Sequence, residues 1–389
     1  ITTQSPSSWA PAKAAAEPLA SRPATGSMTL PKEKLLEHIQ NMRMKVVIKE
    51  SHASPVQDLV INRTDKDSRN IFATVGGNQA TVYDDAHFGD HIGVVVQYTN
   101  EATEYTEGGE LRACAWVSAE GVTPHPHGDA LLAVAGKDKC ISIISVVETR
   151  VTALLKGHEK EIIDLASCAA RPGQVISLSR DGTLRLWDIA EERCLQVYES
   201  PGCTALAWCP DGASFLSASK GGRLLKWDLP EVAAVEVAGG KRKRQVPDEG
   251  PTAFVPEVDG ATAVASGGGT VECMMYLPSG QLVTRDSNGT QHVWDPSTWE
   301  KEQSWKIPNC GSNKATGRCR FGSSACGSFI AAGNHSGEVF VYDTYTGKKV
   351  ATFKPERVSG EVRSCALSDD CRHLLAVYGN GFVFRYEFR

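Results

Sequence analysis

Residues 174–189 read QVISLSRDGTLRLWDI, and this stretch contains the pattern that decides the fold. One mostly apolar run leads into the tight turn RDG at 180–182, and a second run ends in Trp187 and an acid. Two such runs joined by a turn that contains Gly are typical of paired antiparallel β-strands. The arrangement returns in SFLSASKGGRLLKWDL (214–229), QLVTRDSNGTQHVWD (281–295), FIAAGNHSGEVFVYD (329–343) and HLLAVYGNGFVFRYEF (373–388), and more weakly in IFATVGGNQATVYD (71–84) and LLAVAGKDKCISIIS (131–145).

The spacing of these copies predicts a closed ring. The positions that close successive copies lie 61, 43, 40, 67, 48 and 44 residues apart. Three gaps fall near the WD40 repeat period of about 40–45 residues, one is slightly long, and two carry insertions. A four-stranded sheet cannot cover both of its faces alone, whereas sheets stacked radially cover one another. We therefore predict an all-β, seven-bladed WD40 β-propeller whose copies close at Tyr83, Ile144, Trp187, Trp227, Trp294, Tyr342 and Tyr386.

The two ends of the chain are expected to meet in this ring, which we assign to residues 43–389. The last copy provides three strands before Arg389, so we expect Lys45 to Ile48 to add the outer strand and close the ring. Residues 28–42 are expected to form a short helical lead-in. Residues 1–27 are rich in Ala, Pro and Ser without apolar periodicity, which predicts disorder. The step Gly26-Ser27-Met28 also resembles a cloning junction, which would make part of this segment non-native.

Composition narrows the class of protein. Hydrophobic residues make up 41% and charged residues 22% of the 389 residues, as in ordinary globular proteins. The formal charge of −5 argues against bulk nucleic-acid binding, which usually goes with a basic domain. No run of 18 apolar residues occurs, so we expect no membrane association. The 12 cysteines stand largely inside apolar runs without CxxC pairs, which favours a reducing compartment, the cytosol or nucleus.

Polar residues of the third repeat predict a buried hydrogen-bond relay. Gly157-His158 precedes Ser179, Asp181 and Trp187, the order of the His–Ser–Asp–Trp relay of WD40 blades. Such a chain must be fully paired when buried, and it then fixes the register of the strands. His158 is therefore interpreted as structural.

Nothing in the sequence predicts catalysis. The motifs GxxxxGK[ST], HExxH and GxSxG are absent, as is a GxGxxG that follows a strand, so we predict no enzyme activity, no cofactor and no small-molecule substrate. His125-Pro-His127 near Asp129 admits a metal site, but a solvated loop is the favoured interpretation, and no metal is predicted. The basic run Lys241, Arg242, Lys243 and Arg244 is either a solvated loop or a signal for nuclear import or phosphate contact.

Segments between the repeats carry a more specific signal. They include IKESHASPVQDLVIN (48–62), RACAWVS (112–118), KGHEKEIIDL (156–165) and GRCRFGSSACGSFIAAGNHSGEVFVYD (317–343). Together with the repeats, these segments resemble the EED or extra-sex-combs family of WD40 proteins over roughly residues 44 to 389. ATVG-N-TVY, CAW and LLAVAG in this order are more distinctive than a WD dipeptide.

The resemblance implies a role as a core subunit of Polycomb repressive complex 2 in the nucleus. Members of the family receive a helix of the Enhancer-of-zeste SET-domain methyltransferase on the lower face, an expected helix-in-groove contact. A Suppressor-of-zeste-type subunit is a further implied partner. The upper channel of the family binds a trimethylated lysine of the histone H3 tail in an aromatic cage and so stimulates the enzyme.

This sequence departs from the family at the cage. The positions that correspond to its four aromatic rings are Gln57, Arg112, Gly317 and Arg318. Trimethyl-lysine is held by cation–π attraction, so non-aromatic and cationic residues there predict that methyl-lysine reading is lost. Arg320 matches the family's arginine beside the cage, and Phe321 is expected in the blade core.

Two other functions stay open at this point. In the first, Tyr98, Tyr105 or Trp305 supplies the rings and the protein is a working methyl-lysine reader. In the second, the chain is an unrelated WD40 adaptor, such as a ubiquitin-ligase substrate receptor. The second predicts a likeness limited to WD and GH dipeptides, whereas the likeness here extends between the repeats.

Overall fold

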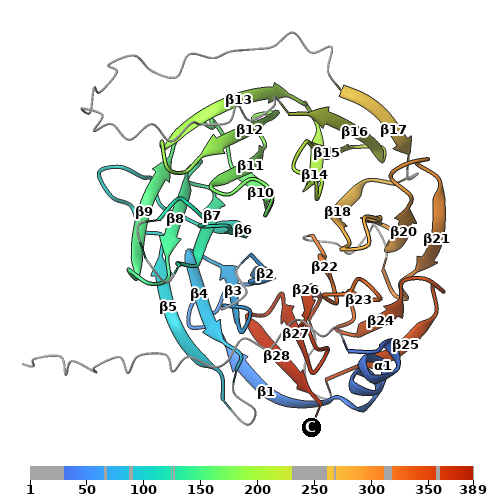
Figure 1. The fold of residues 1–389 in the computed structure, drawn as a ribbon. Coiled ribbons are helices and arrows are strands. Elements are labelled where there is room, and N and C mark those ends of the chain that lie inside the picture. The colour runs from blue at the N-terminus through green and yellow to red at the C-terminus, as the bar shows by residue number, and fades with distance from the viewer. Residues whose placement is uncertain are drawn as a thin grey trace, which may run out of the picture.

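Each repeat forms one four-stranded antiparallel sheet in the computed structural model, and seven such sheets stand around a central axis (Figure 1). The structure describes residues 30–64, 68–86, 91–123, 125, 128–229, 261–266, 269–310, 318–355 and 360–388. The predicted seven-bladed propeller is confirmed. The segments 1–27 and 241–244, on which the expectations of disorder and of a basic loop rest, lie outside the described residues.

We number the blades 1 to 7 along the chain and name the strands from the axis outward. Blades 1 to 3 consist of β2 (Val56–Ile61), β3 (Ile71–Gly76), β4 (Gln79–Asp84) and β5 (Gly93–Thr99); β6 (Leu111–Val117), β7 (Leu131–Gly136), β8 (Ile141–Ser145) and β9 (Arg150–Leu155); and β10 (Ile162–Ser167), β11 (Gln174–Ser179), β12 (Thr183–Asp188) and β13 (Arg193–Glu199).

Blades 4 to 6 follow the same order. They consist of β14 (Cys203–Trp208), β15 (Ser214–Ser219), β16 (Arg223–Asp228) and β17 (Ala261–Ser266); β18 (Val271–Tyr276), β19 (Leu282–Asp286), β20 (Thr290–Trp294) and β21 (Lys301–Lys306); and β22 (Phe321–Ser323), β23 (Phe329–Gly333), β24 (Val339–Asp343) and β25 (Lys349–Phe353).

Blade 7 joins the two ends of the chain. Its strands are β26 (Val362–Leu367), β27 (His373–Tyr378), β28 (Phe382–Glu387) and, outermost, β1 (Arg43–Lys49). β1 pairs antiparallel with β28, so the strand that the sequence assigned to ring closure covers the edge that β28 would otherwise expose.

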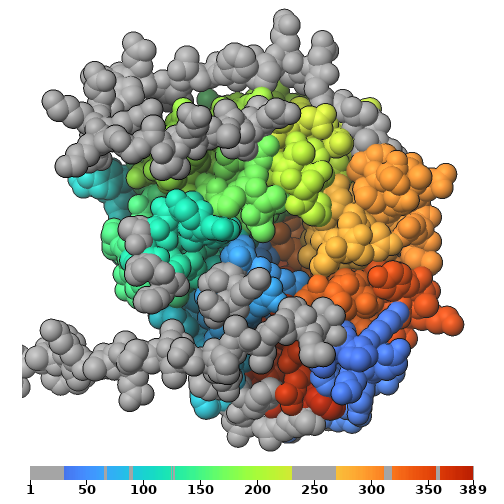
Figure 2. Space-filling view, viewed as in Figure 1, coloured from blue at the N-terminus to red at the C-terminus, as the bar shows by residue number. Residues whose placement is uncertain are grey.

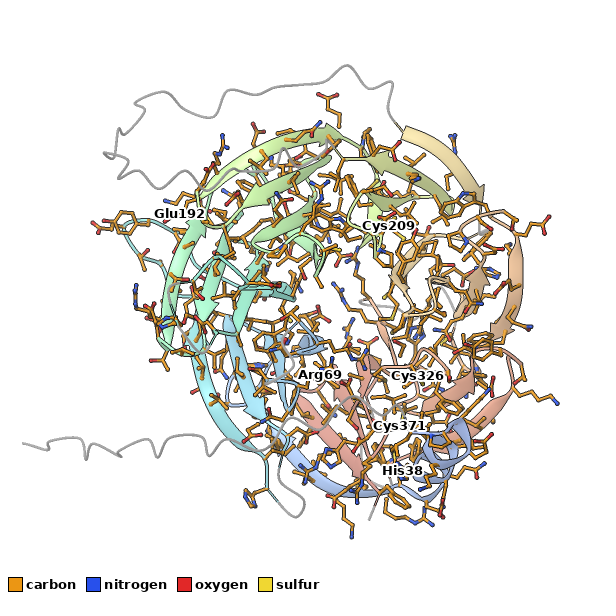
Figure 3. The ribbon with its side chains drawn as sticks, in the orientation of Figure 1. His38, Arg69, Glu192, Cys209, Cys326 and Cys371 are labelled. Carbon is orange, nitrogen blue, oxygen red and sulfur yellow. The ribbon has the colours of Figure 1, made fainter. Side chains whose placement is uncertain are left out.

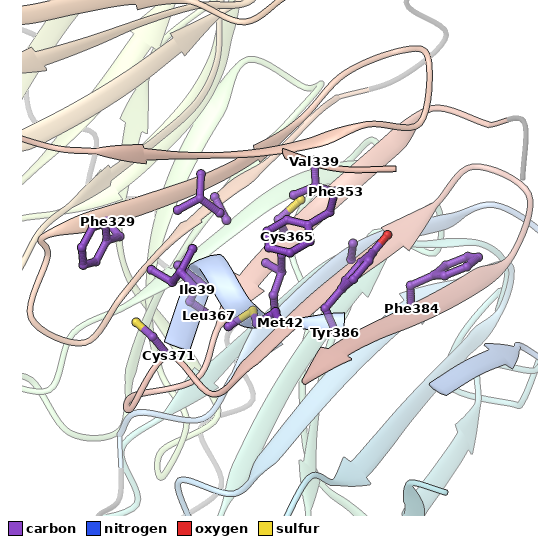
Figure 4. Close-up of a cluster of buried hydrophobic side chains, with 14 of the residues drawn as sticks. Ile39, Met42, Phe329, Val339, Phe353, Cys365, Leu367, Cys371, Phe384 and Tyr386 are labelled. Carbon is purple, nitrogen blue, oxygen red and sulfur yellow. The ribbon is translucent and has the colours of Figure 1, made fainter. Parts of the chain in front are cut away.

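A helix reinforces this closure. α1 (Lys32–Asn41) lies within the segment 28–42, beside β25 (Figure 1). Leu35, Ile39 and Met42 recur at helical spacing and are buried in one apolar cluster with Phe353 and Tyr386 (Figure 4). Since these side chains come from both ends of the chain, the cluster ties the helix to blades 6 and 7.

Polar contacts fix the two ends of α1. At its start, Lys32 Nζ lies 2.6 Å from Asp343 Oδ2. In its last turn, His38, labelled beside the helix in Figure 3, stacks on Phe388 with ring centroids 4.4 Å apart and bonds through Nδ1 to the carbonyl of Asp370 at 2.8 Å. The helix is therefore held by charge at one end and by stacking at the other.

Bulges in the innermost strands shape the axis of the ring. The pairing shifts by one residue near the start of β2, β6, β10, β14, β18 and β26. A bulge bends its strand and re-aims the side chains next to it. Gln57 and Arg112 are the extra residues of the bulges in β2 and β6, so these sequence-predicted positions stand at comparable heights in blades 1 and 2.

Candidate functional site: the blade relay and the axial channel

A chain of hydrogen bonds runs through the interior of blade 3. Trp187 Nε1 donates to Ser177 Oγ at 2.8 Å, and the same hydroxyl lies 2.6 Å from His158 Nε2. His158 Nδ1 lies 2.7 Å from Asp181 Oδ2. The structure therefore joins three of the four residues named for the relay, but it corrects the fourth, because Ser179 takes no part in it.

The error follows from the period of a β-strand. Ser177 and Ser179 are two residues apart in β11, so both point to the same face and periodicity cannot separate them. Ser179 stands at the end of the strand, where its hydroxyl donates to the carbonyls of Lys160 and Glu161 at 2.9 and 3.1 Å.

A spacing in the sequence would have found the right serine. Ser177 precedes its tryptophan by ten residues. The same separation joins Trp227 to Ser217 in blade 4 and Trp294 to Thr284 in blade 5, each at 2.9 Å. A hydroxyl ten positions before the closing tryptophan is thus a repeated feature of the chain.

The two hydroxyls give a matched pair of variants. We expect Ser177→Ala to lower the free energy of unfolding by about 2–4 kcal/mol, because it leaves Trp187 Nε1 and His158 Nε2 without a partner, at about 1–3 kcal/mol for each buried group. Ser179→Ala should cost about 1 kcal/mol. Chemical denaturation of both variants measures the difference, and an equal or larger loss for Ser179→Ala would contradict the assignment.

The relay also defines the protonation of His158. The Asp181 carboxylate can only accept, so His158 Nδ1 carries a proton and donates to it; in the neutral imidazole Nε2 then accepts from the Ser177 hydroxyl, which itself accepts from Trp187. Burial lowers the pKa of His158 even though the Asp181 carboxylate raises it. Burial would raise the pKa of Asp181, but the hydrogen bonds from His158 and Thr183 hold it well below its ordinary value.

These shifts predict a dependence of stability on pH. Both folded-state pKa values lie below the unfolded ones, so the stabilisation is complete above about pH 6.5, the usual pKa of His, and is lost as the pH falls. Between pH 7 and 5 the wild type should lose stability relative to His158→Gln, with a slope of up to about 1.4 kcal/mol per pH unit. Parallel denaturation curves at each pH measure this; a constant difference would contradict a neutral His158.

An axial cavity of about 500 Å³ opens at the end of the ring where the inner strands finish. The space-filling view shows the ring hollowed at its centre (Figure 2). Apolar side chains of the inner strands form much of the cavity wall, among them Trp116, Trp208, Tyr276 and Phe321. The charged side chains of Asp58, Asp164 and Arg320, which stand near the starts of their inner strands, also line it.

Two arginines that precede β22 connect blade 6 to the far side of the axis. Arg320 Nε lies 3.3 Å from Asp58 Oδ1 of blade 1, and its Nη2 donates to Asp164 Oδ1 of blade 3 at 2.8 Å. Arg318 Nη1 donates to the carbonyl of Ile163 at 2.8 Å and lies 3.3 Å from Asp164 Oδ2. These bonds cross the axial channel and join three blades that are not neighbours of one another.

The two aspartates also connect adjacent blades. Asp58 accepts from the backbone N–H of Cys114 in blade 2 at 3.4 Å, and Asp164 accepts from that of Leu206 in blade 4 at 3.2 Å. Burial raises the pKa of Asp58, with Arg320 acting in the opposite direction. Burial alone would lower the pKa of Arg320, but Asp164 and Asp58 raise it, so the guanidinium stays charged.

The remaining sequence-predicted channel positions have other surroundings. Arg112 Nε donates to Glu161 Oε1 at 2.7 Å, and its Nη2 lies 2.8 Å from Glu110 Oε2. Gln57 is half-buried in β2. Gly317 lies outside the described residues. Arg112 is therefore paired with two acids, Glu110 and Glu161.

The aromatic residues considered as substitutes for the cage do not stand on the inner strands. Tyr98 belongs to β5 and Trp305 to β21, the outermost strands of blades 1 and 5. Tyr105 lies between β5 and β6, 64% exposed, with Lys156 Nζ 5.5 Å from its ring centre. Phe321 is buried in the core between blades 5 and 6.

In the loop that was considered as a metal site, the described side chains of His125 and Asp129 bond to other residues. His125 Nε2 lies 3.1 Å from Glu148 Oε1, and the buried Asp129 accepts from Ser145 Oγ at 2.5 Å. His127 lies outside the described residues. Within the described ranges, no three His, Cys, Asp or Glu side chains are grouped to hold a metal, and no helix is long and apolar enough to span a membrane.

The sequence contained an unused signal for the aspartates. Asp58 and Asp164 are each followed by Leu, in QDLV and IDLA, and each stands directly after the bulge of its inner strand. A carboxylate at the same place in two inner strands indicates a shared cationic partner near the axis. Which arginine would reach them depends on the ring geometry and was not readable from the sequence.

Comparison with known proteins agrees with this fold. The family described as "WD domain, G-beta repeat" matches residues 149–188 and 192–228. The chain is 23% identical over 351 residues to the maize Polycomb group protein FIE2, covering 86% of this chain and 88% of that protein. It is 23% identical over 369 residues to the Drosophila melanogaster Polycomb protein esc, covering 88% and 83%.

A third match, over a shorter stretch, is to a protein named EED. The chain is 29% identical over 133 residues to the Polycomb protein EED of Chaetomium thermophilum, covering 32% of this chain and 23% of that protein. The resemblance drawn from the sequence is confirmed. This chain is a WD40 β-propeller whose homologues are the Polycomb group proteins FIE, EED and esc.

Proposed function

We propose that this propeller is a non-catalytic scaffold subunit of a Polycomb-type histone H3 lysine methyltransferase complex in the nucleus. The observation that carries the proposal is homology to Polycomb group proteins over 86–88% of the chain. Its partners are an Enhancer-of-zeste-type SET-domain methyltransferase, bound through a helix, and a Suppressor-of-zeste-type subunit. A closed ring suits this role, because its rims are rigid surfaces for partners.

The channel gives the proposal its second part, the loss of trimethyl-lysine reading. Arg318 and Arg112 stand at two of the positions where the family has aromatic rings, and Arg320, which matches the family's arginine, bonds to blade 3 beside Arg318. A cation of this kind repels a trimethylammonium group, whereas the family's rings attract it. The histone H3 tail, if bound at all, is then bound without preference for methylation.

Affinity purification of the tagged full chain from nuclear extract, followed by mass spectrometry, tests the scaffold role. We expect a SET-domain methyltransferase to co-purify at near-equal amount and to remain after a wash in high salt, as an apolar helix-in-groove contact should. Recovery of a cullin adaptor in place of the methyltransferase would contradict the proposal and favour a ubiquitin-ligase receptor.

A further inference from the structure

Arg285 of β19 is a buried cation that forms no ion pair with the described residues. Arg285 is 1% exposed, and among the described residues its hydrogen bond is from Nη2 to the Cys310 sulfur at 3.5 Å. Neither Nε nor Nη1 has a hydrogen-bond acceptor in the part of the chain that the structure describes. Buried charges in proteins are otherwise paired and hydrogen-bonded, because desolvation strongly penalises an isolated ion.

A second unpaired donor stands directly opposite. Gln291 of β20 is the cross-strand partner of Arg285 and is 0% exposed. Its Oε1 accepts from Trp305 Nε1 at 2.9 Å, and since indole nitrogen is a donor only, the orientation of the amide is fixed. Gln291 Nε2 then faces away from Trp305, with no acceptor among the described residues.

The other blades show what this position ordinarily contains. In blade 5, Arg285 pairs with Cys273, the first residue after the bulge of the innermost strand, and Gln291 pairs with Arg285 from the third strand. In every other blade the two residues at the corresponding places in the second and third strands are both apolar. The pairs are Val75 and Ala80, Ala135 and Ile141, Leu178 and Leu184, Ala218 and Leu224, Ala332 and Phe340, and Val377 and Val383. Blade 5 alone places a cation and an amide where the fold requires only packing.

The surroundings of the pair supply little negative charge. Arg285 and Gln291 face the core between blades 5 and 6, next to Val283, Val293 and Trp305. Burial raises the pKa of the Cys310 thiol despite the nearby guanidinium, which keeps the sulfur protonated and uncharged. Glu272 is a carboxylate that interacts electrostatically with Arg285, yet no ion pair within 4.0 Å joins the two among the described residues. Burial raises the pKa of Glu272 too.

We propose that Arg285 and Gln291 hold a small monoatomic anion, chloride under cellular conditions, in the core between blades 5 and 6. Unsatisfied N–H groups on two facing side chains, set among apolar neighbours, are the chemistry that favours an anion over a cation or an apolar group. The proposal is independent of any Polycomb function.

Crystals of the full chain grown or soaked in sodium bromide test the site directly. Bromide scatters anomalously, so we expect an anomalous peak within about 3.5 Å of Arg285 Nε or Nη1 and Gln291 Nε2. A water molecule without anomalous signal at this position would overturn the proposal. This measurement uses the unaltered chain and does not depend on whether a variant folds.

Stability against chloride provides a second readout. At constant ionic strength, replacing a bulky anion by chloride from 5 to 500 mM should raise the unfolding temperature of the wild type by several degrees, because an anion that binds only the folded chain stabilises it. Arg285→Met and Gln291→Leu, which imitate the other blades, should lose this shift. Arg150→Met, at a 65% exposed arginine, is the control and should keep it. An equal chloride shift in Arg285→Met would overturn the proposal.

Discussion

Deletion of residues 1–49 is expected to abolish a soluble, cooperatively unfolding propeller. The deletion removes α1 and β1, and with them the buried side chains of Leu35, Ile39, Met42 and Val46. Each contributes about 1.5–3 kcal/mol by burial, so their sum is comparable with the whole stability of a folded domain, about 5–15 kcal/mol. The edge of β28 is exposed at the same time, which favours aggregation.

The matched control is deletion of residues 1–27 alone. The sequence predicts that this segment takes no part in the fold, so the shorter deletion should leave the unfolding temperature unchanged. Size-exclusion chromatography and differential scanning calorimetry of both proteins check the pair. A monomeric 50–389 fragment with a wild-type transition would show that the ring does not depend on closure by β1.

Arg320→Met is expected to have the largest effect of any single substitution in the channel. The change leaves the carboxylates of Asp58 and Asp164 buried without the cation that bonds to both. Removing one partner of a buried ion pair costs about 3–5 kcal/mol, because the charge left behind is uncompensated. Urea denaturation of the variant should show this loss, whereas Arg150→Met at an exposed site should stay within about 0.5 kcal/mol of the wild type.

The pH dependence of the Arg320→Met variant separates charge from packing. Without the guanidinium the folded-state pKa of Asp58 rises further above its unfolded value, so protonation of Asp58 relieves the penalty. The difference from the wild type should therefore shrink as the pH falls from 7 to 4. A difference that stays constant over this range would mean that Arg320 acts only by filling space.

The repeat architecture could be predicted because it is a local property of the sequence. Each strand pair is visible in a stretch such as 174–189, and the need to cover blade faces and edges leads from seven copies to a ring. The closing strand followed from the same argument, since β28 lacked a partner. These steps use only neighbouring residues and a count.

The details of the site depend on contacts between distant residues and were less accessible. Ser177 and Ser179 share one face of β11, because side chains in a strand alternate with a period of two residues. Which of the two hydroxyls joins the relay depends on its depth within the blade, and the alternation does not encode that depth. The bonds from Arg318 and Arg320 to Asp164 join residues more than 150 positions apart. The resemblance pointed to Arg318 as an altered cage position and to Arg320 as the family's arginine, but the partners of both appear only in the folded ring.

Titration of histone H3 peptides tests the central claim most directly. Isothermal calorimetry with the full chain should compare a trimethylated peptide with its unmodified form at the same ionic strength. We predict equal affinities within about twofold, or no binding of either. A working cage contributes about 2 kcal/mol or more, roughly a 30-fold preference, so tenfold tighter binding of the trimethylated peptide would contradict a channel closed by arginine.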